Sequence, residues 1–478
     1  MSTKLIQNLK QKYQGKNILV VGLGLQGGGV GIAQFFAELG AIVTVTDKKS
    51  ETQLYQSIDR LIQLSNKIIF HLGGHYVEDF INADFIFKGP SVRWDCPEII
   101  EAQKKNIPIE MEMAFVVTNY PGKVIGITGT RGKSTTTNLI FNVLKQNGFK
   151  VTLGGGLPGI STIEYLKDAD EDSWLVAELS SWALSSFHRA KISPHISVFT
   201  NLYPGHLNYY KNLEDYFYDK EAIFQYQKEE DYLVINKSLK ENFLKLGLSF
   251  FDRHAPKGAP GDFQKITSPR LDKNFCAPSL LFFSKSDFPY PLTYLKGEHN
   301  LENAAATLKV AEILKIDKNK AVEAIKNFGG LPYRQQVVGK KGNVIFVNDT
   351  TSTTPIATIK AIDTFKDKKI VLILGGNSKN LPYDQLIKQL DNVEKIVLLA
   401  GSFTDQILDT PEVSFTEKIS KQVYDDLQKA VREAYRIALD LKNSYVLFSP
   451  GATSFAMFNN EFHRGEEFNR IVNKIINE

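Results

Sequence analysis

The chain has 478 residues, of which 43% are hydrophobic and 23% charged, and its formal net charge is +4. This length predicts about three domains that each bury a core, and the composition is typical of a soluble globular protein. No basic run is interleaved with aromatic residues, and the only cysteines are Cys96 and Cys276, so we expect no nucleic-acid partner, no disulfide framework and a cytoplasmic location.

The first twelve residues predict a polar amphipathic helix that lacks the apolar core of a signal peptide. No apolar run approaches the length that spans a bilayer, so we expect no membrane insertion. Short β-rich runs then alternate with amphipathic helices, which is typical of parallel α/β sheets. Glycine and proline interrupt this pattern at 120–122 and 329–332. These breaks predict three domains with boundaries at 1–121, 122–330 and 331–478.

The first domain contains a glycine-rich turn between a strand at 17–22 and a helix that reaches about Gly40. Its residues are Gly22, Leu23, Gly24, Gln26 and Gly27. A second strand at 42–46 ends at Asp47, where dinucleotide-binding folds place an acidic residue beside a ribose. We expect this turn to bind a nucleotide diphosphate. A dehydrogenase that binds NAD, and a turn that only packs helix on strand, remain alternatives.

The second domain opens with the most informative segment of the chain, a strand at 123–128 that leads into a loop rich in glycine and a helix at about 134–146. The loop is Gly129, Thr130, Arg131, Gly132, Lys133, Ser134 and Thr135. Its glycines can turn backbone N–H groups toward phosphate oxygens, its lysine supplies a cation, and Ser134 or Thr135 can reach magnesium. Ile127 stands where the strict P-loop has its first glycine, so the loop is a variant. We expect triphosphate binding; the alternative is a chance glycine-lysine turn.

Two later strand ends in this domain carry polar side chains suited to phosphoryl chemistry. Glu178 ends a strand at 174–178, and His206 follows a strand at 196–200. Parallel strands open at the same edge of a sheet, so both side chains are expected near the phosphate loop. A carboxylate there can reach a magnesium ion that bridges the phosphates. A surface carboxylate and an ordinary loop histidine are the alternatives for these two residues.

Five motifs in this order and spacing resemble those of the Mur ligases, ATP-dependent amide-bond-forming enzymes of peptidoglycan precursor synthesis. They are Gly129–Thr135, Glu178–Ser181, Asn201–Asn208, Tyr216–Phe224 and Gly297–Asn303. The resemblance covers nearly the whole chain. It implies an α/β fold with a Rossmann-like N-terminal domain, a P-loop ATPase-like central domain and a Rossmann-like C-terminal domain.

Within the family, the chain resembles the enzymes that add D-glutamate to UDP-N-acetylmuramoyl-L-alanine through an acyl phosphate. The residues that carry this likeness are the first glycine turn with Asp47, Leu331–Arg334, Ser449–Phe455 and Arg464-Gly465. The resemblance implies ATP and Mg²⁺ as cofactors, small-molecule substrates and a monomer. The UDP would lie in the first domain, with Asp47 near the uracil.

The resemblance also assigns roles residue by residue. The catalytic residues would be Lys133, Glu178, His206 and Lys220, and the metal would be held by Ser134, Glu178, His206 and a carbamylated Lys220. Besides the phosphate loop, ATP would contact Asn300, Arg334 and Asp349. The incoming amino acid would lie among Thr353, Lys379, Ser454 and Phe455.

Three single residues and one short segment depart from the family pattern. Thr351 replaces a lysine, Tyr333 replaces a histidine, Gly156 replaces an asparagine, and Gly89-Pro-Ser91 replaces Ser-Pro-Gly. These changes cluster around the substrate and the amino acid rather than around ATP. An enzyme that joins L-glutamate or another amino acid is therefore the first alternative. A non-catalytic nucleotide-binding protein is the second, although the intact set of predicted catalytic residues argues against it.

Overall fold

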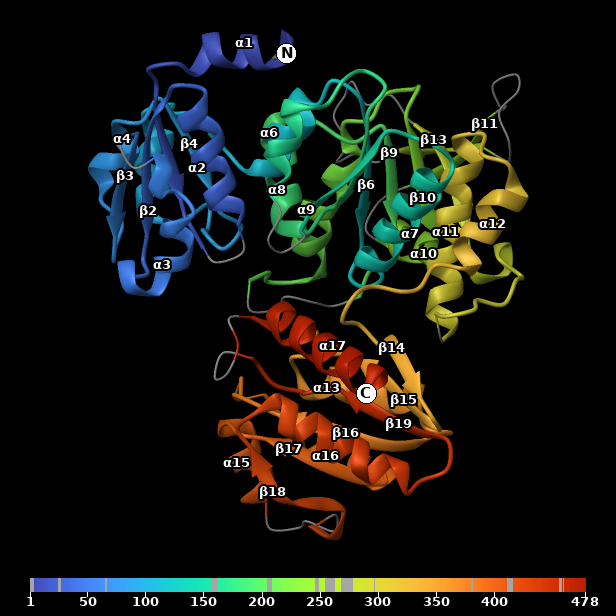
Figure 1. Ribbon diagram of the computed structural model, residues 1–478. Coiled ribbons are helices and arrows are strands. Elements are labelled where there is room, and N and C mark those ends of the chain that lie inside the picture. Colours follow the sequence, from blue (N-terminus) through green and yellow to red (C-terminus); the bar gives the residue numbers. More distant parts are fainter. Residues whose placement is uncertain are drawn as a thin grey trace. The chain divides into compact units, whose positions relative to one another are not determined.

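The computed structural model describes residues 4–24, 27–64, 67–156, 161–203, 209–245, 249–253, 263–267, 278–295, 297–379, 381–410, 416–454, 458 and 460–478. The chain divides into two compact units. The first unit comprises Met1–Leu292 and Glu298–Phe328, and the second Thr293–Gly297 and Gly329–Glu478. Within the described residues the strands form one sheet at the N-terminus, one in the centre and one at the C-terminus (Figure 1).

The N-terminal sheet is parallel throughout its described strands, in the order β3-β2-β1-β4-β5. The strands are β1 (Asn17–Val21), β2 (Ile42–Asp47), β3 (Ile68–Leu72), β4 (Phe85–Lys88) and β5 (Ile109–Glu110). The helices are α1 (Lys4–Tyr13), α2 (Gly28–Glu38), α3 (Glu51–Asp59), α4 (Val77–Ile81) and α5 (Pro97–Lys104). Helices cover both faces, so the apolar run of β1 is buried from Ile18 to Val21. The strand order reverses between β1 and β4, and ligands of such sheets bind in the crevice at that point.

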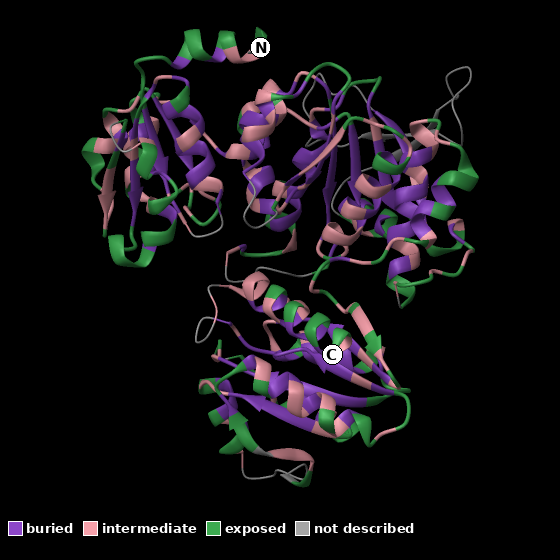
Figure 2. Cartoon of the chain, in the orientation of Figure 1, coloured by how far each residue is buried: buried purple, intermediate pink, exposed green. Residues whose placement is uncertain are grey.

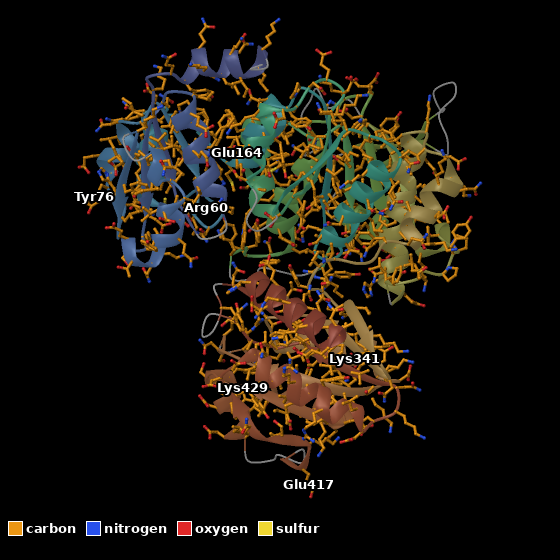
Figure 3. The ribbon with its side chains drawn as sticks, in the orientation of Figure 1. Arg60, Tyr76, Glu164, Lys341, Glu417 and Lys429 are labelled. Carbon is orange, nitrogen blue, oxygen red and sulfur yellow. The ribbon has the colours of Figure 1, made fainter. Side chains whose placement is uncertain are left out.

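The N-terminal sheet and the central domain share a hydrophobic core. Phe36 of α2 packs against Phe115 of α6 (Glu112–Asn119), with ring centres 5.5 Å apart, within a cluster that continues into the central domain. At the edge of this contact, Lys167 pairs with Glu38 of α2 at 2.7 Å and also with Glu164, which is labelled in Figure 3. These contacts make the two sheets one unit.

The central sheet has the order β11-β12-β13-β10-β9-β6-β8-β7, and β12 is paired antiparallel to both β11 and β13. The strands are β6 (Lys123–Thr128), β7 (Val151–Gly155), β8 (Trp174–Glu178), β9 (Ile196–Phe199), β10 (Tyr232–Asn236), β11 (Ser249–Arg253), β12 (Phe263–Thr267) and β13 (Ser279–Phe283). The helices are α7 (Lys133–Gln146), α8 (Ser181–Ala190), α9 (Leu213–Gln225), α10 (Leu239–Lys245), α11 (Glu298–Ile313) and α12 (Lys318–Lys326). Strand β6 lies between β8 and β9, so the predicted phosphate loop is flanked by the ends of both neighbours.

The second unit is built on a sheet of order β14-β15-β19-β16-β17-β18, in which β14 is antiparallel to β15. Its strands are β14 (Gln336–Lys341), β15 (Val344–Asn348), β16 (Lys369–Gly375), β17 (Lys395–Leu399), β18 (Ile419–Tyr424) and β19 (Ser444–Phe448). Its helices are α13 (Pro355–Thr364), α14 (Asp384–Gln389), α15 (Ser402–Leu408), α16 (Leu427–Leu439) and α17 (Glu461–Asn477). Helices α16 and α17 pack on one core cluster and α13 and α14 on another, and Figure 2 shows the central strands buried.

The predicted α/β fold is confirmed, and the expected strands are present. Helix α7 begins at Lys133, one residue earlier than expected, and α2 spans Gly28–Glu38, directly after the glycine turn. The second unit resumes at Gly329, and the three domains bounded at 121 and 330 stay a prediction. None of the helices within the described residues is both long enough and apolar enough to cross a membrane.

Candidate active site

The loop after β6 has a backbone that only glycine accommodates at two places. Gly129 and Gly132 have φ angles of 141° and 81°. A Cβ on Gly129 would lie 2.0 Å from Oγ1 of Thr200, and one on Gly132 would lie 2.6 Å from Oδ1 of Asn303. The loop is therefore packed closely against its neighbours, and its backbone can approach a ligand without side chains in the way.

The segment after β9 holds this loop in place. The backbone N–H of Arg131 donates to Oδ1 of Asn201 at 2.8 Å, and that of Thr130 donates to the Asn201 carbonyl at 2.9 Å. The Thr200 hydroxyl donates to the Arg131 carbonyl at 2.6 Å, and the Tyr203 backbone N–H donates to the Thr130 hydroxyl at 3.0 Å. These bonds fix Thr130 and Arg131, two of the residues predicted to contact ATP.

Lys133 begins α7, where the helix dipole adds positive potential. Its Nζ donates to the carbonyls of Gly129 and Thr130, each at 3.2 Å, so its charge lies against the backbone of the loop. Ser134 and Thr135 follow in the first turn and are half-buried. The sequence-predicted cation and hydroxyls are thus grouped at one helix N-terminus, which is suited to bind a phosphate chain.

Glu178 lies at the end of β8, where it is paired in register with Ile127 of β6. Its carboxylate is therefore one strand away from the loop that follows β6, as predicted. His206 lies outside the described residues. Among the residues that are described, no group of three or more His, Cys, Asp or Glu side chains could hold a metal ion.

Lys220 of α9 is the most deeply buried cationic group at the loop, with 1% of its surface exposed. Asn212 caps α9 by accepting the Asp215 N–H at 2.8 Å. The Lys220 Nζ donates to the Gly129 carbonyl at 3.0 Å and to Thr128 Oγ1 at 3.2 Å. Burial lowers the pKa of Lys220 well below its usual value, and the charge of Lys133 lowers it further.

This environment fits the carbamylated lysine that the family resemblance implies, because carbamylation requires a neutral amine. The carbamate would add an anionic oxygen ligand to the hydroxyl of Ser134 and the carboxylate of Glu178. Oxygen ligands of this kind are those that Mg²⁺ prefers. The metal set Ser134, Glu178, His206 and Lys220 stays a prediction.

Asn300 lies in the first turn of α11 and is buried behind the loop. Its Oδ1 accepts from Asn303 Nδ2 at 3.0 Å, and Asn303 Oδ1 in turn accepts from the Thr136 hydroxyl of α7 at 3.1 Å. Asn300 is therefore connected to the loop through Asn303. Its contact with ATP stays a prediction.

The glycine turn after β1 has the backbone that a nucleotide-binding turn requires. Gly22, Gly24 and Gly27 have φ angles of 93°, 62° and 93°, and Leu23 between them is buried. The start of α2 packs closely against this turn at Gly29, where a Cβ would lie 2.4 Å from the Gly22 carbonyl oxygen. Gln26 lies outside the described residues.

Asp47 lies beside this turn, as predicted, and its carboxylate is engaged by backbone donors. The Gly24 N–H donates to Oδ2 at 3.2 Å, and the Lys49 N–H donates to Oδ1 at 2.9 Å. A pocket of about 340 Å³ lies between α3 and the end of β3, the strand that pairs with β2. It is lined by Ser50, Glu51, Ile58, Phe70, Leu72 and Gly73.

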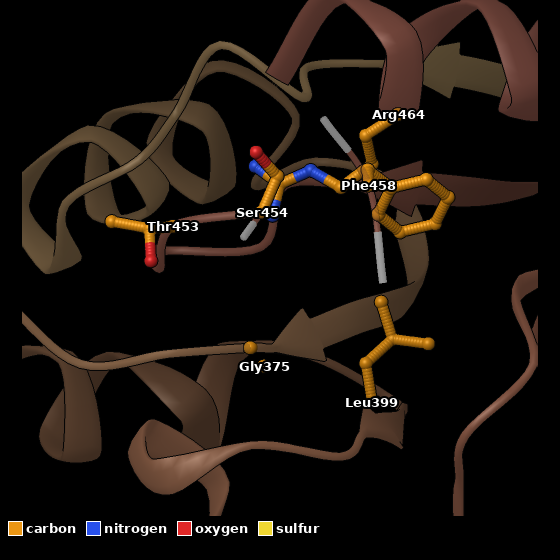
Figure 4. Close-up of a pocket in the computed structure, with 7 residues that line it drawn as sticks. Gly375, Leu399, Thr453, Ser454, Phe458 and Arg464 are labelled. Atoms are coloured by element: carbon orange, nitrogen blue, oxygen red, sulfur yellow. The ribbon is translucent and has the colours of Figure 1, made fainter. Parts of the chain in front are cut away.

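The second unit brings together two of the residues predicted to surround the amino acid. Lys379 Nζ donates to Thr353 Oγ1 at 2.9 Å, which groups a cation with a hydroxyl. Ser454 is 4% exposed and lines a narrow pocket with Arg464 and Gly376, and Figure 4 shows Ser454 and Arg464 on the same side of that pocket. Phe455 lies outside the described residues.

Asp349 is buried beneath the strand ends of the second unit. Its Oδ1 accepts the Gln335 N–H at 3.0 Å, and its Oδ2 accepts the hydroxyls of Ser352 and Ser449 at 2.6 and 2.7 Å. Burial raises the pKa of Asp349 to about 6. In this arrangement Asp349 positions the turn that carries Arg334; direct contact of either residue with ATP stays a prediction.

Two of the departures from the family pattern contact each other. The Thr351 hydroxyl donates to the Tyr333 carbonyl at 3.0 Å, and the Thr351 backbone N–H donates to the same oxygen at 3.1 Å. Tyr333 has a φ of 63°, which is rare for a residue with a side chain, and its ring packs where a Cβ on Gly465 would lie 2.5 Å away. Thr351, which stands where the family pattern has a lysine, therefore holds the backbone of Tyr333 in place.

Sequence reasoning missed several residues of the loop's surroundings. Thr200, Asn201 and Asn303 contact the loop directly. In the sequence, Thr200 ended a predicted strand and Asn201 and Asn303 bounded two of the five motifs, but none of the three was assigned a role. Polar residues directly after a buried parallel strand were the available signal for the first two, since β9 neighbours β6.

Comparisons with known proteins show the family of this chain. Family models match three parts of the chain: the Mur ligase middle domain at residues 127–311, the MurD-like N-terminal domain of Mur ligases at 16–110, and the Mur ligase glutamate ligase domain at 333–451. The UDP-N-acetylmuramoylalanine–D-glutamate ligase of Borreliella afzelii is 35% identical, with 96% of this chain and 98% of that protein covered.

The ligase of the same name from Roseiflexus sp. is 34% identical, with 96% of this chain and 98% of that protein covered. Among solved structures, the UDP-N-acetylmuramate-alanine ligase MurC of Thermotoga maritima matches with a TM-score of 0.56 and 21% identity, over 96% of this chain and 99% of that one. This structural match shows a common fold, and the sequence matches extend over nearly the whole length. The chain belongs to the Mur ligase family.

Proposed function

We propose that this enzyme joins D-glutamate to UDP-N-acetylmuramoyl-L-alanine at the expense of ATP, in peptidoglycan precursor synthesis. Its curated relatives at 32 to 35% identity carry the name of this D-glutamate ligase and are matched over nearly their full lengths. We assign residues 1–121 to the UDP-substrate domain, 122–330 to the ATP domain and 331–478 to the amino-acid domain.

The observation that carries the proposal is the convergence of Lys133 and Lys220 on the Gly129 carbonyl, at the end of β6 and beside Glu178. A phosphate-binding loop alone would need only the first lysine. A second, deeply buried lysine whose pKa is strongly lowered has no use in a simple nucleotide-binding module. It fits a catalytic site in which that amine is converted to an oxygen ligand.

ATP would bind with its phosphates on the loop Gly129–Thr135, where backbone N–H groups and the α7 dipole face it. Lys133 would neutralise charge on the transferred phosphoryl group, and Asn300, Arg334 and Asp349 would contact or position the rest of the nucleotide. When bound, Mg²⁺ would supply a Lewis acid at the phosphate oxygens. Ser134, Glu178, His206 and carbamylated Lys220 would hold it.

The nucleotide sugar would bind at the turn of Gly22, Leu23, Gly24, Gln26 and Gly27, with its uracil near Asp47. The carboxylate of its alanyl arm would attack the γ-phosphorus, the bond to ADP would break, and an acyl phosphate would form. The amine of glutamate would then attack the acyl carbon, phosphate would leave, and the amine would lose a proton. Lys133 stabilises the charge that develops in the first step.

The incoming glutamate would be held by Lys379, Thr353, Ser454 and Phe455. The cation of Lys379 already shares a hydrogen bond with Thr353, so a carboxylate placed there would meet both groups. An enzyme that joins L-glutamate is the alternative, because Thr351, Tyr333 and Gly156 depart from the family pattern. We also propose that the enzyme works as a monomer in the cytoplasm.

Product analysis tests the proposal directly. Purified enzyme is incubated with ATP, Mg²⁺, UDP-N-acetylmuramoyl-L-alanine and D-glutamate, and the nucleotide-sugar product is isolated and analysed by mass spectrometry. We expect one glutamyl residue to be added for each phosphate released. Phosphate release without a glutamylated product would contradict the ligase assignment, and NAD reduction by the same protein would favour the dehydrogenase alternative.

A further inference from the structure

Trp94 connects the N-terminal sheet to the central domain. It lies in the loop 89–96, between β4 and α5, and packs against the small core cluster of the N-terminal sheet that contains Ile86 and Ile99. Its indole Nε1 donates to the Ser185 hydroxyl of α8 at 2.9 Å. One side chain therefore contacts both parts of the first unit.

Two cations lie against the Trp94 ring. Nζ of Lys88, the last residue of β4, is 4.2 Å from the ring centre, and the Arg189 guanidinium of α8 is 3.9 Å from it. None of the ion pairs formed by described residues includes either cation, and the negative face of the ring attracts both. Burial, together with the nearby charge of Arg189, lowers the pKa of Lys88 to about 8.

The start of the same loop forms a wall of the crevice where the strand order reverses. The Gly89 N–H donates to the Val21 carbonyl at 2.8 Å, and Lys88 Nζ donates to the Val92 carbonyl at 2.9 Å and so closes the turn between them. A Cβ on Gly22 would lie 4.0 Å from both Gly89 and Val92. The loop thus packs directly on the glycine turn at which ligands of such sheets bind.

The elements that contact Trp94 and its neighbour Arg93 lie next to the proposed catalytic residues. Helix α8 begins at Ser181, three residues after Glu178. Arg93, next to Trp94, lies 4.9 Å from the ring centre of Tyr209. The adjacent Tyr210 donates to Asp219 at 2.8 Å, and Asp219 directly precedes Lys220 on α9.

We propose that Trp94 is a positioning residue for the nucleotide sugar: it fixes the crevice wall 89–96 to α8, and so sets the distance between the substrate's carboxylate and the ATP loop. This rests on the proposed function. Trp94 touches neither reactant; it acts through Gly89 and Gly22 on one side and through Ser185 and Arg189 on the other.

The test compares Trp94→Leu and Trp94→Phe with the wild-type enzyme, with KM measured separately for nucleotide sugar, ATP and glutamate. Trp94→Leu removes the ring and is expected to raise KM for the nucleotide sugar about tenfold, a change appropriate to the loss of two cation–π contacts. KM for ATP stays within about twofold, because the loop after β6 is untouched. Trp94→Phe keeps an aromatic face for both cations but loses the hydrogen bond to Ser185, so it is expected to recover only part of the loss.

Trp174→Leu is the matched control. Trp174 also lies beside a lysine, with Lys123 Nζ 5.6 Å from its ring centre, but it starts β8 at the sheet edge opposite the ATP loop. Its replacement is expected to leave all three KM values unchanged. Arg189→Met removes one cation only, and combined with Trp94→Leu it is expected to add no further increase.

Amide hydrogen exchange of 89–96 in the substrate-free protein gives a readout that does not depend on the reaction. Faster exchange in Trp94→Leu than in wild type and Trp174→Leu supports the anchoring role even if the wild type proves to use another substrate. Unchanged exchange together with an unchanged KM for the nucleotide sugar overturns the proposal. An equal rise of all three KM values with a lowered Tm also overturns it, since that result describes a general loss of stability.

Discussion

The side-chain nitrogen of Lys220 lies 3.0 Å from the carbonyl oxygen of Gly129, so the buried lysine of α9 contacts the first glycine of the loop after β6. Lys133 donates to the same carbonyl at 3.2 Å. Two lysines that share one acceptor repel each other, and burial favours the neutral form of the enclosed one. The pKa of Lys220 is accordingly well below its usual value. This pair links the ATP loop to the proposed metal ligand.

Replacement of Lys220 separates the roles of its charge and its amine. Lys220→Arg keeps a cation that cannot become a carbamate, and Lys220→Ala removes the side chain. We expect both to lower kcat about 100-fold or more, the usual loss when a group that stabilises transition-state charge is removed. Lys228→Arg, at an exposed position after α9, is the control. A Lys220→Arg enzyme with wild-type kcat would contradict a carbamylated Lys220.

Gly132→Ala is expected to damage ATP binding through backbone geometry. Its Cβ would lie 2.6 Å from Asn303 Oδ1, at a φ of 81°. Gly148→Ala is a matched control at the other end of α7, since φ is 80° there and nothing lies within 4 Å of an added Cβ. Both changes are expected to cost about 1 kcal/mol of stability through strain at positive φ. Only Gly132→Ala is expected to weaken ATP binding in calorimetry, and equal affinities in the two variants would contradict this.

Lys379→Ala tests the proposed glutamate site. Because its ammonium shares a hydrogen bond with Thr353, loss of the cation is expected to raise KM for glutamate about ten- to a hundredfold, as for hydrogen bonds to charged groups. KM for ATP is expected to stay unchanged in steady-state assays. Lys366→Ala, at an exposed position after α13, is the control. An increase confined to KM for ATP would remove Lys379 from the glutamate site.

The raised pKa of Asp349 predicts that the stability of the protein depends on pH. Burial raises its pKa to about 6 from a model-compound value of 3.8, so the folded protein holds this proton more tightly than the unfolded chain. Its contribution to stability is therefore complete below about pH 4 and is lost as the pH rises toward 6, a change of about 3 kcal/mol.

Asp349→Asn removes this titration. We expect the difference in free energy of unfolding between wild type and Asp349→Asn to shift against the wild type as the pH rises from about 4 to about 6. Urea denaturation at several pH values measures that difference. A difference that is constant over this range would show that Asp349 keeps an ordinary pKa in the folded protein.

The sequence predicted the elements of the site better than their contacts. Hydrophobic strands followed by glycine or polar residues located the ends of β1, β6 and β8, because strand periodicity and turn chemistry are local. The contact of Asn303 with Gly132 joins residues far apart in the chain, and no local pattern encodes it. The pairing of Thr351 with Tyr333 likewise depends on the αL backbone of Tyr333. Such contacts follow from how the elements pack.

The amino-acid specificity was the least predictable part of the site. The sequence placed Thr353 and Lys379 in the same region by resemblance alone, and the structure brings them within 2.9 Å. Which stereoisomer they accept depends on the spacing of cations and hydroxyls around one small molecule, which residue types do not fix. That question has to be settled by turnover.

The most direct test of the account is phosphate release from ATP in the presence of Mg²⁺ and UDP-N-acetylmuramoyl-L-alanine, with D-glutamate, with L-glutamate and without an amino acid. Lys133→Ala serves as the inactive control, because it removes the cation at the ATP loop. We expect sustained release only with D-glutamate. Release that depends on L-glutamate instead, or no release with either isomer while ATP still binds, would contradict the proposed D-glutamate ligase.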